Sequence, residues 1–232
     1  MSCIWRVKRE TPFRQTDSID EIIFSLLSVR GIHTKKEIDM FLSPPHPSDI
    51  APKDIGISLL SLKKVIQRIK KALQLKESIV VYTDYDADGI TAGAIMWETL
   101  HHLGASVMPY IPHRVDEGYG LSKKGIDTVR DLYDPTLIIT VDHGITAGDY
   151  VAYAGKHGID VIVTDHHVKP KVLPKCLIVH TDKLSGAGIA WFVARHIIHQ
   201  PGQFSNDLLS FACIGTIADM VPLTGGNRSI AS

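Results

Sequence analysis

The sequence has few cysteines, no excess of charge and no long apolar run. Its three cysteines (Cys3, Cys176 and Cys213) lack metal-type spacing and cannot form an even disulfide framework, so a reducing cytoplasm is expected. Lys+Arg and Asp+Glu both total 25, a balance that neither indicates nor forbids a nucleic-acid partner. No segment reaches transmembrane length, and Met1–Glu10 lacks the apolar core of a signal peptide. We therefore expect no membrane partner.

The most informative stretch joins an apolar run to three alternating aspartates. Residues 79–82 are apolar and mostly β-branched, which predicts a buried strand. Asp84, Asp86 and Asp88 follow, and residues 90–103 have helical periodicity. Crowded carboxylates repel one another unless a cation lies among them. The stretch therefore predicts a metal site at the end of a strand.

An EF-hand calcium loop is excluded, although Asp84, Asp86, Asp88 and Gly89 match the start of its pattern. That loop requires a bidentate Glu at its twelfth position, where this chain has Ile95. A predicted strand also precedes the acidic residues, in the place of the EF-hand helix.

Strands and helices alternate over most of the chain. We predict strands at about 79–82, 106–111, 136–141, 160–164 and 176–180, and helices at about 58–75, 90–103, from 122, after 148, 189–199 and 207–217. Two shorter helices are predicted to begin at Ser18 and Thr34, each with a capping-box pattern. The fold class is therefore α/β, a mostly parallel sheet with helices on both faces. A helical region (1–75) is expected to pack on the core formed by 76–232.

Two more predicted strands end in side chains that can bind metal. Asp142 follows the third strand, and Asp165, His166 and His167 follow the fourth. In a parallel sheet the carboxyl ends lie together, so these groups are expected near the first acidic loop. Carboxylates with imidazole suit Mn²⁺ or Mg²⁺, and the absence of a nearby cysteine argues against structural zinc.

So many carboxylates imply two ions, which can clamp the oxygens of a phosphoryl transfer and activate a water. We assign Asp86 and Asp88 to the two ions, with Asp142 bridging them. His166 is expected to complete one shell.

Other polar residues are candidates for substrate contact and support. His167 is expected to face the substrate as phosphate ligand or proton donor, and Asp165 to position the loop or a histidine. His113 and Arg114, at a strand end, can hold phosphate or form an ordinary polar loop. Gly186 and Gly188, before a predicted helix, fit either an anion site or a plain tight turn.

Four segments together resemble the motifs of the DHH phosphoesterase superfamily: YTDYDADG (82–89), VDHG (141–144), DHH (165–167) and GTIADMVP (215–222). Within it, residues 110–122, 185–188 and 30–32 are similar to the RecJ-type exonucleases, which degrade single-stranded DNA in the 5′→3′ direction. The resemblance extends over essentially the whole chain.

The resemblance implies a set of roles. The metal ligands would be Asp86, Asp88, Asp142, His166 and Asp219, and His167 would contact the scissile phosphate. Tyr82 stands where many members have a histidine ligand, and Asp84 is the candidate to replace it. The family's second, substrate-gripping domain is not found before Ser232, so an N-terminal fragment or the product of a shortened gene is expected.

The predicted function is metal-dependent hydrolysis of single-stranded DNA from its 5′ end, with single-strand-binding or repair proteins as further partners. A relative acting on short oligonucleotides or nucleotides is a second hypothesis, which residues 110–122 argue against. A non-catalytic DNA-binding or replication scaffold is a third. The repelling carboxylates argue against it, because a scaffold has no physical need for them.

Overall fold

The structure is a computed structural model that describes residues 18–198 and 203–232. Contacts divide the chain into two compact units, with the division between Pro45 and His46. The helix predicted at 58–75 belongs to the second unit, and the domain boundary expected near residue 75 stays a prediction. Cys3 and the predicted helix end at His199 lie outside the described residues.

Two helices make up most of the described part of the first unit, α1 (Ile19–Val29) and α2 (Lys35–Leu42). Each begins with the capping box that its sequence predicts. The side chains of Ser18 and Thr34 accept from the amide three residues on, and the glutamate at that position accepts from the backbone amide of the capping residue. Gly31, at φ 80°, lies between them in the left-handed conformation that glycine adopts without strain.

The second unit contains a five-stranded parallel sheet with the order β2-β1-β3-β4-β5. Its strands are β1 (Ser78–Thr83), β2 (Ser106–Tyr110), β3 (Leu137–Val141), β4 (Asp160–Asp165) and β5 (Leu177–His180). The helices are α3 (Leu59–Leu75), α4 (Ala87–His102), α5 (Lys123–Tyr133), α6 (Gly148–Lys156), α7 (Gly186–Ile197), α8 (Gln203–Ala218) and α9 (Gly225–Ala231). Two short 3₁₀ turns, Pro47–Asp49 and Pro52–Ile55, precede α3.

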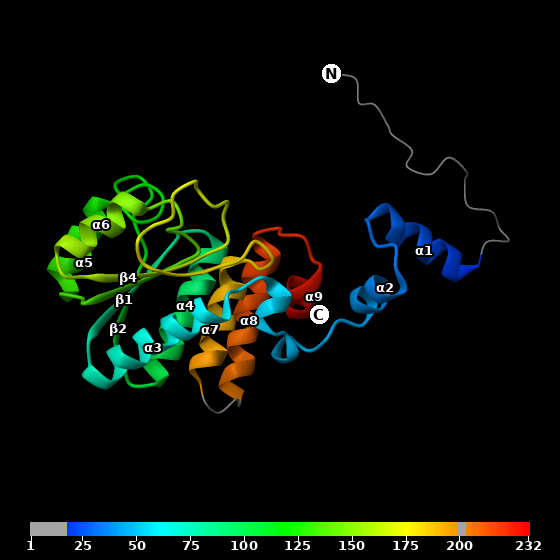
Figure 1. Cartoon of the computed structure of the whole chain (residues 1–232), viewed down its shortest axis with the longest axis horizontal. Coiled ribbons are helices and arrows are strands. Elements are labelled where there is room, and N and C mark those ends of the chain that lie inside the picture. The colour runs from blue at the N-terminus through cyan, green and yellow to red at the C-terminus, as the bar shows by residue number, and fades with distance from the viewer. Residues whose placement is uncertain (1–17, 199–202) are drawn as a thin grey trace, which may run out of the picture. The chain divides into compact units, whose positions relative to one another are not determined.

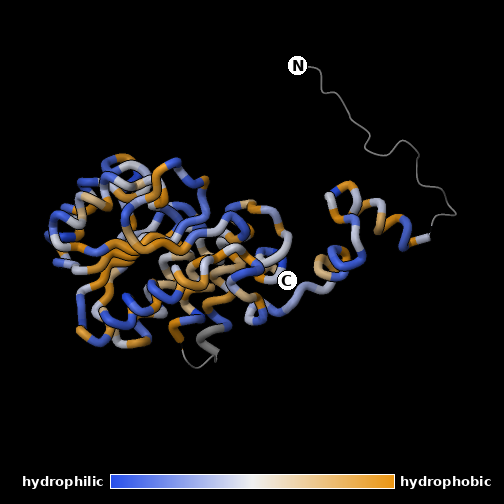
Figure 2. Tube along the Cα trace, in the orientation of Figure 1, coloured by the Kyte–Doolittle hydropathy of each residue, from blue (hydrophilic) through white to orange (hydrophobic). Residues whose placement is uncertain are grey.

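Helices cover both faces of this sheet, as predicted. Alternate residues of β1 point to opposite faces: Val80 and Tyr82 join the core beneath α5 and α6, whereas Ile79 and Val81 join the core beneath α3, α4, α7 and α8 (Figure 1). The strands form the most continuous apolar band of the unit (Figure 2), as expected for a parallel sheet buried on both faces. Among the described residues, no helix is long and apolar enough to span a membrane.

The strand order has a topological switch point between β1 and β3. After β1 the chain adds β2 on one side, then returns to add β3 on the other side of β1. Ligands of open α/β sheets bind outside the carboxyl ends of the strands at such a switch point. The acidic residues after Thr83 and after Val141 flank this point, and the end of β4 lies next to it.

Two helices near this switch point begin earlier than the sequence predicts. α4 begins at Ala87 rather than near residue 90, because the Asp86 side chain caps it by accepting from the Gly89 amide at 2.9 Å. α7 begins at Gly186, so its glycines form the first turn of the helix rather than a preceding loop. Neither α9 nor the 3₁₀ turns were predicted.

Candidate metal centre

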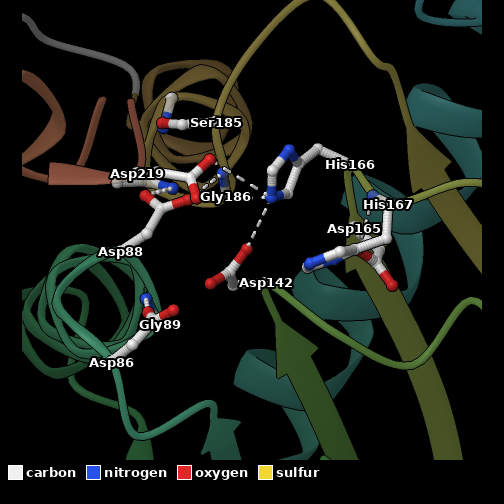
Figure 3. A network of polar contacts seen from close by, with 12 residues as sticks. Asp86, Asp88, Gly89, Asp142, Asp165, His166, His167, Ser185, Gly186 and Asp219 are labelled. Atoms are coloured by element: carbon white, nitrogen blue, oxygen red, sulfur yellow. Dashed lines mark hydrogen bonds and ion pairs between the residues drawn. The ribbon is translucent and has the colours of Figure 1, made fainter. Parts of the chain in front are cut away.

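Six predicted metal ligands and His167 converge at the carboxyl edge of the sheet. Their ligand atoms form three groups, each with all atoms within 4.8 Å of one another: Asp142, His166 and His167; Asp88, His166 and Asp219; and Asp84, Asp86 and Asp142. They come from the β1–α4 turn, the first turn of α4, the residues that follow β3 and β4, and the residue after α8 (Figure 3). The first of these groups links the other two, because it shares His166 with the group of Asp219 and Asp142 with the group of Asp84.

The His166 imidazole lies at the centre of the acidic side chains. Its Nε2 atom is 3.1 Å from Asp142 Oδ1, 3.6 Å from Asp219 Oδ2 and 3.9 Å from Asp88 Oδ2 (Figure 3). Although burial lowers the pKa of a histidine, the Asp142 carboxylate raises that of His166 above its ordinary value. Three carboxylate oxygens therefore lie within 3.9 Å of this imidazole nitrogen.

The amino end of α7 holds the Asp88 carboxylate. Oδ2 accepts from the Gly186 amide at 2.6 Å and Oδ1 from the Ala187 amide at 2.8 Å. This is the anion-binding property of a helix N-terminus, used here on a side chain of the same protein. The Gly188 amide donates to Ser185 Oγ at 3.1 Å. Both glycine amides therefore already donate to protein oxygens, which argues against a direct contact with phosphate. The phosphate-binding role expected of Gly186 and Gly188 stays a prediction.

Asp142 lacks such support. Its side chain is 2% exposed, and its Oδ1 atom has no hydrogen-bond partner despite the nearby His166 ring. Burial raises the pKa of Asp142 to about 7 and, together with Asp219, raises the pKa of Asp88. A Cβ at Gly186 would overlap the Asp142 carboxylate. Buried acidic oxygens with an unpartnered acceptor, beside an imidazole, fit a hard divalent cation such as Mn²⁺ or Mg²⁺.

Asp165 positions the loop after β4. It accepts from the Ile145 amide at 2.8 Å, from the His167 amide at 3.0 Å and from His167 Nδ1 at 2.8 Å. Burial alone would raise the pKa of Asp165, but these bonds lower it to about 2. The same pairing raises the pKa of His167 to about 9. His167 is therefore held as a cation at neutral pH, and its side chain remains 46% exposed.

The two candidate phosphate contacts after β2 differ in their surroundings. His113 is exposed, and its Nδ1 lies 2.9 Å from a carboxylate three residues on. The Arg114 guanidinium lies over the Tyr85 ring, 5.0 Å from its centroid. Tyr85 meets Tyr119 edge-on, and Tyr119 OH lies 3.4 Å from His167 Nε2. Arg114 thus belongs to a row of side chains that ends at His167. Neither tyrosine was predicted to line the site, although both lie within segments that carry the family resemblance.

Tyr82 and His143 are buried residues next to the candidate metal ligands. The Tyr82 side chain is buried and packs with Leu121 and Ile126. Asp84, the candidate to replace it as ligand, belongs to one of the three ligand groups. His143 Nε2 donates to the Tyr82 carbonyl at 3.0 Å, and burial lowers the pKa of His143 to about 4. This neutral histidine ties β3 to β1, a contact that the sequence did not reveal.

The fold and the site define an α/β protein with a carboxylate- and histidine-lined centre for divalent cations. Residues 78–216 match the model of the DHH family, N-terminal domain. The chain belongs to this family, as its motifs predicted.

The chain is similar in sequence and in structure to RecJ exonucleases. The single-stranded-DNA-specific exonuclease RecJ of Bacillus subtilis (strain 168) is 38% identical over 224 residues, 92% of this chain and 28% of that protein. A crystal structure of exonuclease RecJ bound to manganese matches with a TM-score of 0.68 at 36% identity, over 73% of this chain and 46% of that one. RecJ from Thermus thermophilus in complex with Mn²⁺ matches with a TM-score of 0.70 at 32% identity, over 88% of this chain and 29% of that one. The chain therefore spans less than half the length of these relatives.

Proposed function

We propose that this chain is the catalytic part of a metal-dependent phosphodiesterase that hydrolyses single-stranded DNA from the 5′ end. The observation that carries the proposal is the cluster of carboxylates and histidines at the β1–β3 switch point, in a chain similar to RecJ. Because the chain spans 28% of that relative, catalysis by these residues alone is part of the proposal.

Two ions, Mn²⁺ or Mg²⁺, are proposed as cofactors. When bound, they would lower the pKa of a coordinated water and polarise the phosphoryl group. Asp142 is the candidate bridging ligand, because it belongs both to the group with Asp84 and Asp86 and to the group with His166. His166 in turn shares a group with Asp88 and Asp219, so each ion would have its own set of protein ligands.

His167 is proposed to hold the scissile phosphate and to donate a proton to the leaving group. Its pairing with Asp165 keeps the ring charged at neutral pH, while Nε2 points away from that carboxylate toward the Tyr119 hydroxyl. Arg114 lies in the same row of side chains as Tyr85 and Tyr119, and it would add a second positive charge for the DNA backbone. Asp165 would act only through the histidine that it holds.

Two finer assignments accompany the proposal. Single-strand-binding or other repair proteins are proposed as further partners, since a degrading enzyme must reach DNA that such proteins cover. A reducing cytoplasm is proposed as the location, because Cys176 and Cys213 are both free thiols in the part of the chain that the structure describes.

The test is a Mn²⁺-dependent digestion with three substrates in parallel: 3′-labelled single-stranded DNA, the matched duplex and a dinucleotide. Stepwise loss from the 5′ end of the single strand alone supports the proposal. Cleavage of the dinucleotide alone would favour the relatives that act on short oligonucleotides. A calorimetric titration with Mn²⁺ addresses the scaffold hypothesis, which absence of binding at micromolar metal would favour.

A further inference from the structure

His180, at the end of β5, reaches back to the loop that carries the two motif histidines. β4 and β5 pair in parallel, and Asp165 stands opposite His180 in the last step of that pairing. Both strands end at this pair. The His180 ring reaches the loop after β4, where its Nε2 donates to the backbone carbonyl of His167 at 2.7 Å.

This contact completes the fixation of His167. Asp165 accepts from the backbone amide of His167 and from its ring Nδ1, at 3.0 and 2.8 Å. Those two bonds fix the amide side of the residue and the face of its ring. The bond from His180 fixes the carbonyl side, so the peptide unit cannot tilt without breaking it. A half-exposed side chain on a loop otherwise has freedom to move, and a small displacement at a reacting group is costly.

We propose that His180 is a positioning residue for His167. It holds the loop backbone so that Nε2 of His167 points toward the phosphate site, and it touches neither substrate nor metal. The inference rests on the proposed function for its kinetic consequence, because it assumes that His167 acts on the phosphate. It goes beyond the DHH motifs, since His180 lies outside all four of the segments that carry them.

The chain offers a graded series of substitutions. In His180→Gln the side-chain amide nitrogen lies at about the reach of the imidazole Nε2 and can still donate to the carbonyl. In His180→Asn the amide is one carbon shorter and falls at the place of Nδ1, too far from that oxygen. His180→Ala has no donor. His157→Ala is the matched control, because His157 is an exposed histidine that follows α6.

The kinetic test measures kcat, KM, Mn²⁺ affinity and Tm for each variant. His180→Ala and His180→Asn should lower kcat about tenfold, the scale of one net hydrogen bond, with Mn²⁺ affinity unchanged and Tm lowered by no more than a few degrees. His180→Gln should recover most of the loss, and His157→Ala should match the wild type. An unchanged kcat in His180→Ala overturns the inference. A loss of kcat that His180→Gln does not recover also overturns it, as does a loss that is explained by unfolding of the variant at the assay temperature.

Nitrogen NMR of ¹⁵N-labelled histidines separates this inference from the proposed function, because it requires no turnover. The His180 Nε2–H proton should exchange slowly in the wild type. The ring resonances of His167 should shift in His180→Ala and stay in place in His180→Gln. If these shifts occur in a chain without phosphodiesterase activity, the contact stands and the proposed function fails. Unshifted His167 resonances in His180→Ala overturn the positioning role whatever the activity.

Discussion

Asp142 and Asp165 occupy equivalent places at the ends of two neighbouring strands and differ in their partners. Both are buried, at 2% and 1% exposure. Asp165 accepts three hydrogen bonds, which lower its pKa to about 2 despite its burial. Asp142 has an oxygen without a hydrogen-bond partner, and burial raises its pKa to about 7.

The difference shows what each carboxylate is for. Burying a charged group is unfavourable unless donors or an opposite charge compensate it. Backbone and ring N–H groups compensate the negative charge of Asp165, so this carboxylate needs no cation. Asp142 faces another ligand atom, His166 Nε2, at 3.1 Å instead of a set of donors. Its compensation is therefore expected from a cation, and the two residues should respond differently to mutation and to metal.

The largest expected effect follows from removing Asp142. Asp142→Ala should abolish activity and metal binding together, because a bridging carboxylate serves both ions; single catalytic electrostatic groups already contribute about 10²–10³-fold. Mn²⁺ titration by calorimetry and turnover of single-stranded DNA are the measurements. Retained turnover in this variant would contradict the two-metal assignment.

In the absence of metal, the two aspartates should show opposite effects on stability. Asp165→Asn leaves the amides of Ile145 and His167 without a charged acceptor and should lower the free energy of unfolding by about 1–3 kcal/mol. Asp142→Asn removes a destabilised buried charge and should raise that free energy. Urea unfolding in the presence of a chelator measures both. A shift of the same sign in the two variants would end the contrast between them.

The fold could be read from the sequence because its signals are local. Capping boxes at Ser18 and Thr34, and apolar runs that end in acidic residues, depend on neighbours a few positions away. The fold class and five strands were predicted in this way and are confirmed. Helix starts were less accurate: Asp86 was interpreted as part of a loop, yet it caps α4, because one aspartate can serve as both helix cap and candidate ligand.

The supports of the site could not be predicted, because they join distant segments. The amides of Gly186 and Ala187, at the start of α7, donate to the side chain of Asp88, which precedes Gly186 by 98 residues, and no local pattern reveals this contact. His143, Tyr119 and His180 reach their partners only after the strands align, and no spacing rule marks them. The candidate metal ligands could be predicted from the sequence because few residue types bind metal ions. Hydrogen-bonding partners are common residues and carry no such signal.

Gly186→Ala should disturb Asp142 through space while leaving every ligand present. The added Cβ would overlap the Asp142 carboxylate, so we expect a loss of about 1–3 kcal/mol in stability and weaker Mn²⁺ binding. Gly155→Ala in α6 is the control, because nothing lies within 4 Å of its Cβ position. That variant should gain about 0.5–1 kcal/mol, as a helical glycine replaced by alanine does. If Gly186→Ala were as stable as Gly155→Ala, the α7 N-terminus would have to move freely to admit a methyl group.

The smallest expected effect separates the two residues after β2. Arg114 lies against Tyr85 in the row that leads to His167, so Arg114→Ala should raise the KM for single-stranded DNA about fivefold to tenfold and reduce its dependence on salt. His113 pairs with a carboxylate of its own loop and is 65% exposed, so His113→Ala should change KM by less than about twofold. KM measured at several salt concentrations distinguishes the two. A larger effect from His113 than from Arg114 would mean that this loop turns its histidine toward the DNA when substrate binds.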